Sequence, residues 1–249
     1  FFLVADWHWV TLFPVEINGP LWSISFEVTS YVLLPLLLAG LFLARPGVSG
    51  WQARALWLVA IALAIGAHWL FVTYYPIDNV RRGWDYGLIG GAKWWMPRYN
   101  PFGFFAMFAI GALAAGVQVR WAGKRGWMFD ILSVAGIAWG AWVIADLLAA
   151  KVDASGFGFL GVPYSFPWFQ LSVALVLAAT PSSLLVGRLL DNRATRYIAT
   201  ISFGIYVWHY VVLELVRKFW APDIDHGQMA EPAKFLVVSG VITLITIAI

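Results

Sequence analysis

The strongest constraint in this sequence is a set of apolar runs that are too long for the core of a water-soluble domain. Residues 55–75 form a run of 21 without a formal charge, and residues 101–119 form a run of 19. A helix needs about 20 mostly apolar residues to cross the hydrocarbon core of a bilayer. Hydrophobic residues make up 61% of the chain and charged residues 12%, which is more apolar surface than a soluble domain can cover. The sequence therefore predicts an all-α fold, a polytopic integral membrane bundle of helices.

Seven apolar segments set the expected number of transmembrane helices at about seven. They are residues 20–44, 55–75, 101–119, 127–150, 166–187, 197–216 and 235–249. No soluble domain and no low-complexity linker separates them, so we expect a single membrane domain over residues 1–249. The sequence has no initiator Met and stops inside the last segment, so we expect this domain to be truncated at both ends.

The loops between the segments predict an orientation in the membrane. Three loops are short and basic, and three are longer and mixed in charge. The short loops are residues 45–54, 120–126 and 188–196, and the longer loops are residues 76–100, 151–165 and 217–234. Because cytoplasmic loops are enriched in Lys and Arg, the short set is predicted to be cytoplasmic. Both sets contain eight Lys and Arg residues, so this prediction depends on their density.

The composition excludes several kinds of site. The chain has no Cys, which excludes a thiol nucleophile, a disulfide and a Cys-ligated metal. No basic run is interleaved with aromatic residues, so we expect no nucleic acid partner and a lipid bilayer as the environment. We predict no metal site, because His8 and the nearby Asp6 have no further ligand that the sequence shows.

Polar side chains mark the first apolar segment as a candidate site. Such groups are costly in a membrane helix and usually face the interior of the helix bundle or a cavity. Ser23, Glu27, Ser30 and Tyr31 share one face of this helix by i+3 and i+4 spacing. We predict that Glu27 belongs to a buried polar site. The alternative interpretation is that Glu27 pairs with an Arg or a hydroxyl to tie helices together.

The sixth segment has a similar stripe. Ser202, Tyr206, His209 and Tyr210 are separated by i+3 and i+4 steps and therefore share a face. His209 is predicted to belong to the same site as Glu27, and the alternative is a packing histidine beside Tyr206. A carboxylate that meets one or two imidazoles in this way suits proton transfer.

The depths of three ionisable groups support a common layer. Glu27, His68 and His209 each lie seven residues from the predicted outer end of their helix. At 1.5 Å per residue this places all three about 10 Å below the outer surface. His68 has no polar companion at helical spacing, so a structural role is favoured for it.

Other charged residues near helix ends have simpler interpretations. Glu214 is followed one turn later by Arg217 and Lys218, which predicts an ion pair at the end of a membrane helix. Asp130 and Asp146 lie near the ends of the fourth segment, where solvation or capping of a helix is expected.

Two further features are a glycine-containing stretch in the third segment and the cations of the long loop at residues 76–100. The stretch Gly111–Gly116 and the small residues near it indicate close packing of helices. The cations of the long loop either form a solvated face or bind an anionic glycan or phosphate, and they are Arg81, Arg82, Lys93 and Arg98.

Three motifs carry a resemblance to a known family. Residues 18–35, NGPLWSISFEVTSYVLLP, resemble a hallmark of the membrane acyltransferase-3 family, N-P-L-W-S-L-S-V-E-E-Q-F-Y-L-L-x-P. Residues 196–209, RYIATISFGIYVWH, are similar to that family's G-x-I-S-Y-x-I-Y-L-x-H segment. Residues 101–116, PFGFFAMFAIGALAAG, are similar to its F-x-x-G-A-L-L-A helix. The motifs follow the family's order, so the resemblance spans nearly the whole chain.

The resemblance implies an O-acyltransferase with roughly ten transmembrane helices in the bacterial inner membrane. It implies acyl-CoA, chiefly acetyl-CoA, as the donor, no permanently bound cofactor, and a hydroxyl of a cell-envelope glycan or small molecule as the acceptor. The family's catalytic Arg and His lie on an earlier helix, so we expect them outside these 249 residues. The catalytic residues expected here are Glu27 and His209. The residues expected to bind substrate are Trp22, Ser25, Tyr31, Ser202 and Tyr206.

Departures from the family motifs leave the substrate subclass open. Val28 replaces the second acid, Thr29 and Ser30 replace Gln-Phe, and Phe203 replaces a Tyr. Two rival functions stay in view. One is a proton-coupled transporter or flippase of glycan-linked or acylated substrates, which would use the same layer of Glu and His as a proton relay. The other is a structural membrane scaffold, which would tolerate Glu27→Ala and His209→Ala together.

Overall fold

The computed structural model describes most of the chain and divides it into two compact units. The described residues are 5–12, 21–40, 47, 49–75, 83–150, 156–222 and 232–249. Unit 1 comprises Phe1–Phe13 and Ser23–Leu190, and unit 2 comprises Pro14–Trp22 and Asp191–Ile249.

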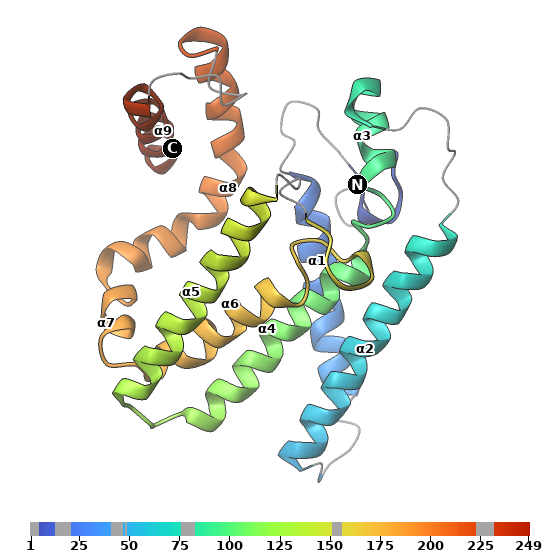
Figure 1. Ribbon diagram of the computed structural model, residues 1–249, viewed down its shortest axis with the longest axis vertical. Coiled ribbons are helices and arrows are strands. Elements are labelled where there is room, and N and C mark those ends of the chain that lie inside the picture. Colours follow the sequence, from blue (N-terminus) through green and yellow to red (C-terminus); the bar gives the residue numbers. More distant parts are fainter. Residues whose placement is uncertain are drawn as a thin grey trace. The chain divides into compact units, whose positions relative to one another are not determined.

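Unit 1 is built from α-helices and short 3-10 turns (Figure 1). Its helices are α1 (Trp22–Leu38), α2 (Gly50–Tyr74), α3 (Gly87–Trp95), α4 (Pro101–Trp121), α5 (Trp127–Ala149), α6 (Trp168–Ala179) and α7 (Val186–Leu190). Its 3-10 turns are η1 (Ala5–Trp7), η4 (Trp84–Tyr86), η5 (Phe159–Gly161) and η6 (Thr180–Ser182). The long helices α2 and α5 run opposite to α4 and α6. We call the end where α2 ends and α4 begins the upper end, and the opposite end the lower end.

Local sequence signals explain where the long helices start. Ser49 caps α2 through a capping box with Gln52, in which each side chain bonds the other residue's backbone N–H. Asn100 caps α4 and accepts from two amides, and Pro101 occupies the first turn, where its missing N–H costs nothing. These caps satisfy backbone donors that helix starts leave free.

The core of unit 1 lies between α2 and α4. Helix α4 packs against both α2 and α6, and α6 packs against α5, so the four helices form a row. The buried core residues are Trp57, Ile61, Ala64, Phe105, Ala106, Ala109, Ile110, Val162 and Phe166. The Trp57 indole donates to the Ala109 carbonyl at 2.7 Å, which satisfies a buried donor. Helix α1 adds Leu33, Leu34 and Leu37 to this core.

Glycines permit a close helix contact between α5 and α6. A Cβ at Gly136 would lie 2.8 Å from Val176, and one at Gly140 would lie 3.0 Å from Ser172. Small residues at such positions let helix backbones approach, as is typical of membrane bundles. In the stretch Gly111–Gly116, where close packing is predicted, the two glycines make no close contact, because a Cβ at either one meets nothing within 4 Å, whereas the small residues Ala109 and Ala114 are buried.

The fifth apolar segment is not one continuous helix. Helix α6 ends at Ala179, η6 follows, and α7 begins only at Val186. Pro181 lies in η6 and lacks the N–H needed to continue a helix. The predicted loop at residues 76–100 also differs, because η4 and the nine-residue α3 lie within it.

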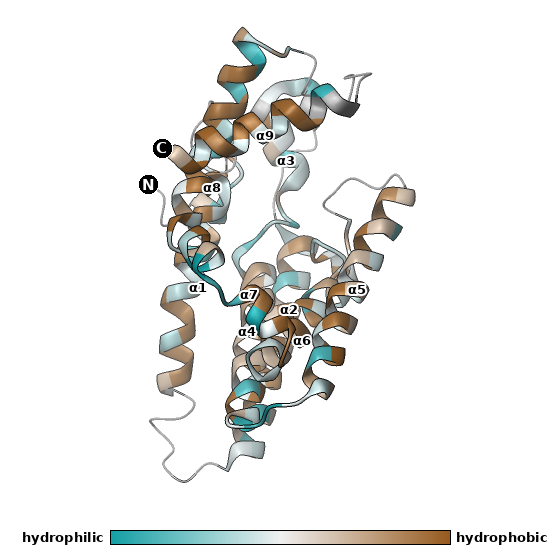
Figure 2. Ribbon diagram, turned by 90° about the vertical axis from the view of Figure 1, so that its left-hand side faces the viewer, coloured by the Kyte–Doolittle hydropathy of each residue, from teal (hydrophilic) through white to brown (hydrophobic). Residues whose placement is uncertain are grey.

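The outer surface of the bundle confirms a helical membrane protein. In the described part of the chain four helices are long and apolar enough to cross a bilayer, namely α2, α4, α5 and α8 (Arg193–Phe219). Large apolar side chains on α5, such as Ile131, Val134 and Trp142, are each more than half exposed. Figure 2 shows hydrophobic residues along the outside of α5, where lipid is the expected neighbour.

Unit 2 consists mainly of α8 and α9 (Pro232–Ala248), which pack against each other. Asn192 caps α8 and forms a capping box with Thr195. The contact with α9 buries Val212, Val216 and Val238.

Candidate functional site

Glu27 lies on the first half of α1, in a half-buried position. Tyr31, one turn later, hydrogen-bonds the Glu27 carboxylate through its hydroxyl, as the i+4 spacing allows. The predicted polar stripe does not face one surface, because Ser30 is 1% exposed whereas Tyr31 is 60% exposed. Ser25 is also buried at 1% exposure. Helix α1 therefore has an inward Ser side and a more open side with Glu27 and Tyr31.

Aromatic contacts hold this part of α1 against α4. The ring of Phe26 stacks on Phe104 with centroids 4.2 Å apart. Further along, the Tyr31 ring meets Phe108 edge-on at 6.1 Å. Such aromatic pairs add to the stabilisation from burial. Glu27 follows Phe26 directly, so it lies at the level of the first turn of α4.

His68 is fully buried and joins α2 to the start of α4. Asn100 Oδ1 accepts from the amides of Phe102 and Gly103, so its amide nitrogen must be the atom that faces His68. That nitrogen lies 2.8 Å from His68 Nδ1 and donates to it. The backbone of Leu160 and Gly161 in η5 lies against the same ring. These contacts give His68 the structural role that its isolation in the sequence favours.

Glu27 and His68 lie at a common level, as their positions in the sequence predict. His68 contacts Gly103, where an added Cβ would be 2.6 Å from Nδ1, and Phe26 contacts the next residue, Phe104. The contacts of the two ionisable groups are nevertheless separate, with Asn100 beside His68 and Tyr31 beside Glu27.

Asp6 is a buried carboxyl that sequence reasoning did not place in the site. It lies in η1 with 0% exposure, and the hydroxyl of Thr29 on α1 donates to its Oδ2 at 3.1 Å. Burial raises the pKa of Asp6 to about 6, while its hydrogen bonds oppose the shift. The neighbouring Trp7 meets Phe102 of α4 edge-on at 5.5 Å, which anchors η1 on the upper end. A carboxyl and its partner 23 residues away leave no periodic signal in the sequence.

The second predicted catalytic residue, His209, lies on α8 in unit 2 and is partly buried. Its Nδ1 lies 2.6 Å from the Tyr206 carbonyl and 3.2 Å from the Ile205 carbonyl. Because carbonyl oxygens only accept, Nδ1 carries a proton, and neutral His209 keeps its lone pair on Nε2. Its ring lies 5.6 Å from that of Tyr206. The Ser202 hydroxyl is exposed and donates to the Ala199 carbonyl at 2.8 Å.

The predicted site residues thus fall into two groups, one in each unit. In unit 1 the structure brings Glu27 together with Tyr31, and in unit 2 it brings Tyr206 together with His209. Trp22 begins α1 in a half-buried position. Arg81 and Arg82 lie outside the described residues. No cluster of three or more His, Asp and Glu that could hold a metal is found among the described residues.

The charged residues near helix ends behave as their positions predict. Arg217 donates to Glu214 at 2.6 Å in an ion pair at the end of α8. Asp130 accepts from the amides of Leu184, Leu185 and Val186 at 2.8–2.9 Å and thereby caps α7. Asp146 is exposed.

Comparison with known proteins defines the class to which this membrane bundle belongs. A family model with the description "Acyltransferase domain" matches residues 1–249, the whole of the sequence. The chain therefore belongs to the acyltransferase-3 family and is a membrane acyltransferase. Searches of curated proteins and of solved structures found no match.

Proposed function

We propose that this membrane acyltransferase transfers an acyl group, chiefly acetyl from acetyl-CoA, to a hydroxyl of a cell-envelope glycan or small molecule, in the bacterial inner membrane. The observation that carries the proposal is Glu27, a half-buried carboxylate on an apolar helix of a chain that matches the acyltransferase family throughout. An ionisable group in such a helix is costly and therefore marks a functional site.

The reaction requires a base near the acceptor. The acceptor oxygen forms a bond to the thioester carbonyl carbon while its O–H proton passes to a base. The C–S bond then breaks, and the CoA thiolate takes a proton and leaves as the free thiol. Glu27 would accept a hydrogen bond or the proton from the acceptor hydroxyl, or would orient a His that does so. Tyr31, which donates to Glu27, holds the carboxylate in place.

The other predicted residues have supporting roles in this proposal. On α1, Trp22 forms a wall of the acceptor site and Ser25 supplies a hydroxyl for hydrogen bonds. On α8, Ser202 likewise supplies a hydroxyl, and the Nε2 lone pair of His209 makes it a competent proton acceptor. Tyr206 packs beside that ring.

The test is a Glu27→Gln variant of the full-length protein in proteoliposomes, assayed for acyl-CoA-dependent CoA release. These 249 residues contain no Cys, so a thiol reagent has no background from them. Because general acid–base groups contribute about 10²–10⁴-fold, we expect acyl transfer to fall by that factor while membrane insertion is kept. Glu214→Gln is the matched control, since Glu214 pairs with Arg217 at a helix end and should retain activity.

Wild-type rates in Glu27→Gln would contradict the role of Glu27. Substrate movement that follows a pH gradient and needs no acyl-CoA would instead identify a transporter.

A further inference from the structure

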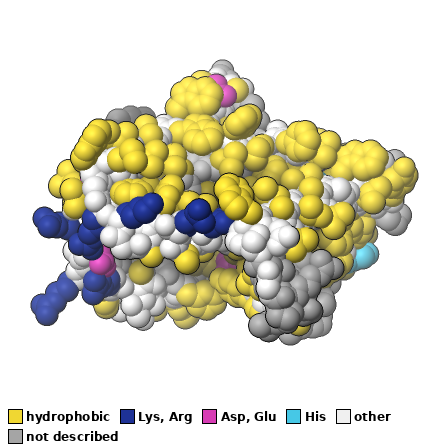
Figure 3. Space-filling view, turned by 90° about the horizontal axis from the view of Figure 1, so that it is seen from below, with side chains coloured by type: hydrophobic (Ala, Val, Ile, Leu, Met, Phe, Trp, Pro, Cys, Tyr) yellow, Lys and Arg dark blue, Asp and Glu magenta, His cyan; other side chains and the backbone are white. Residues whose placement is uncertain are grey.

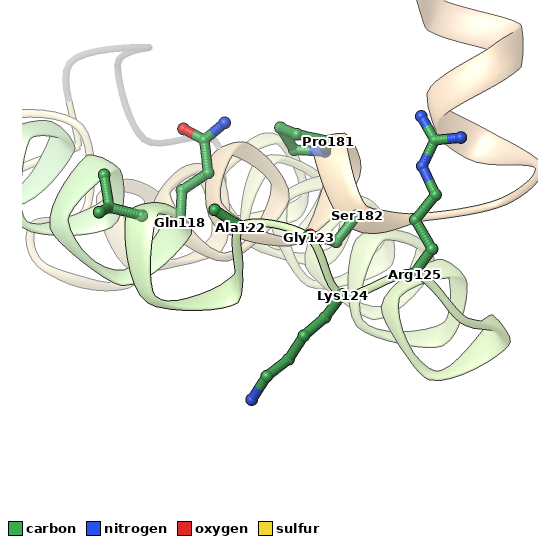
Figure 4. A pocket seen from close by; sticks show the side chains of 8 residues that line it. Gln118, Ala122, Gly123, Lys124, Arg125, Pro181 and Ser182 are labelled. Carbon is green, nitrogen blue, oxygen red and sulfur yellow. The ribbon is translucent and has the colours of Figure 1, made fainter.

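The lower end of unit 1 holds a basic pocket that the proposed chemistry at Glu27 does not use. It has a volume of about 410 Å³ and lies between η6 and the turn that joins α4 to α5 (Figure 4). Its lining includes Gln118, Lys124, Arg125, Pro181 and Ser182. This volume is within the range of small-ligand sites, roughly 300–1,000 Å³.

Hydrogen bonds to backbone carbonyls hold the two walls of the pocket together. The Gly126 amide donates to the Ser182 carbonyl at 3.3 Å, and the Ser182 hydroxyl donates to the Trp121 carbonyl at 3.4 Å. Within the turn, the Lys124 amide donates to the same Trp121 carbonyl at 2.9 Å. Gly123 has a φ of +79°, a left-handed conformation that glycine adopts without strain. The pocket is therefore formed by a braced turn before a ligand arrives.

The polar groups of the pocket favour an anion. Two cations and two uncharged hydrogen-bonding side chains belong to its lining, which includes no Asp or Glu. Figure 4 shows Arg125 and Gln118 extending to the same side of the turn, with Lys124 on the other side. The neighbouring carboxylate, Asp130, is directed to the three amides that begin α7.

Further cations increase the positive potential at this end. Arg54 donates to the Gly116 carbonyl beside the last turns of α4, and Arg120 lies in the final turn of α4. Figure 3, which views the protein from below, shows several Lys and Arg side chains exposed among hydrophobic ones. Like charges around a concave site focus the field and attract anions from solution.

We propose that this pocket binds the phosphate groups of a ligand, and that this ligand is the nucleotide end of the acyl-CoA donor. The assignment of the ligand depends on the proposed function. Arg binds phosphate through two parallel hydrogen bonds, whereas Lys acts as a mobile point charge. The nucleotide end of CoA carries a pyrophosphate and a 3′-phosphate, so it offers several anionic groups to Arg125, Lys124 and the Gln118 amide. The density of Lys and Arg in the short loops predicts that this end faces the cytoplasm, where acyl-CoA is made.

The headgroup of an anionic lipid has the same phosphate chemistry. The experiment therefore compares ligands as well as variants. Its variants are Lys124→Ala/Arg125→Ala, the charge-keeping Lys124→Arg/Arg125→Lys, and Arg188→Ala, which removes an equally exposed cation outside the pocket lining.

The first measurement is binding of adenosine 3′,5′-bisphosphate to the full-length protein in uncharged detergent, by calorimetry. We expect the double Ala variant to bind about tenfold or more weakly, because hydrogen bonds to charged groups contribute roughly 1.5–3 kcal/mol, where 1.4 kcal/mol is a tenfold change. The charge-keeping variant and Arg188→Ala should bind within about threefold of wild type. Equal binding by all variants would overturn the pocket assignment.

The second measurement separates the nucleotide from the rest of the donor. We expect the double Ala variant to raise KM for acetyl-CoA about tenfold with kcat kept, and to leave KM for acetyl-phosphopantetheine unchanged. Equal increases for both donors would overturn the assignment, because a merely structural defect would affect both. Loss of binding to vesicles of anionic lipid, with acetyl-CoA KM unchanged, would assign the phosphate to a lipid and overturn the donor site.

The two proposals fail in different ways. If the wild-type protein releases no CoA from any acyl-CoA, the proposed function fails, and the calorimetric arm still tests the pocket. If the wild type is active and the double Ala variant matches it in both measurements, the donor site alone fails.

Discussion

Substitution of Gly103 by Ala provides the sharpest test of how α2 and α4 are joined. The new Cβ would lie 2.6 Å from Nδ1 of His68, 3.1 Å from Cε1 and 3.3 Å from Cγ. The imidazole cannot easily move, because it is fully buried and Asn100 donates to it at 2.8 Å. We therefore expect the contact to be relieved only by shifting His68 and lengthening that hydrogen bond.

The loss of stability expected for Gly103→Ala follows from comparison with Gly111 on the same helix. A Cβ at Gly111 meets nothing within 4 Å, so Gly111→Ala should be neutral or stabilising by up to about 1 kcal/mol through helix propensity. Extra atoms in a packed core cost about 1–3 kcal/mol. Gly103→Ala should therefore be less stable than Gly111→Ala by about 1–3 kcal/mol, which corresponds to roughly 2–12 °C in Tm for a chain of this size.

The assay is thermal unfolding in detergent, followed by intrinsic fluorescence of the 16 Trp residues. The single variants His68→Ala and Gly103→Ala and the double variant His68→Ala/Gly103→Ala form a double-mutant cycle. In the double variant, removal of the imidazole leaves room for the new methyl group. Its loss of stability should be smaller than the sum of the two single losses. Equal Tm values for Gly103→Ala and Gly111→Ala, or strict additivity in the cycle, would refute the close contact between α2 and α4.

Two further outcomes follow from carboxyl groups outside the active-site proposal. Because burial raises the folded-state pKa of Asp6 to about 6, above the ordinary value near 4, the folded state favours the neutral acid, and stability should fall as pH rises from about 4 through 6. Asp6→Asn should abolish this fall in Tm while it keeps an acceptor for Thr29, and an unchanged pH profile would count against a buried Asp6. Asp130→Ala should lower Tm, because the amides of Leu184, Leu185 and Val186 lose their acceptor. Asp130→Asn should restore part of the loss, and Asp146→Ala on the exposed face of α5 should show none; identical Tm values for all three would contradict the capping role.

Much of the fold could be predicted because its signals lie within single helices. The expected segments 101–119 and 127–150 agree closely with α4 and α5, whose apolar lengths match the thickness of a bilayer. The ion pair of Glu214 and Arg217 was likewise predictable from its spacing alone.

The errors occur where local chemistry interrupts a hydropathy pattern. The fifth segment was predicted as one helix, but Pro181 and the three amides that Asp130 caps divide it into α6, η6 and α7. Helix α3 was missed because its nine residues, rich in Gly, give no long apolar run.

The candidate site shows the same division between local and distant contacts. The hydrogen bond between Tyr31 and Glu27 spans one helical turn, so its residues could be named from their spacing. The contacts of Asp6 with Thr29 and of His68 with Asn100 join residues 23 and 32 positions apart. No periodicity links such residues, so only the packed structure could pair them.

The sequence by itself determined that this protein is a helical membrane bundle and which residues form most of its helices, and it singled out Glu27 as a rare charge within an apolar helix. Hydropathy, helical spacing and caps act within a turn or a single span, so the amino-acid order carries them directly. Only the tertiary structure decided that Asn100 hydrogen-bonds His68 and that the buried Asp6 of η1 lies beside Thr29 of α1. It also decided that η6 and the turn between α4 and α5 line a basic pocket. These features arise where segments distant in the chain pack against each other. Which residues meet there depends on how whole helices pack, and no local pattern in the sequence records it.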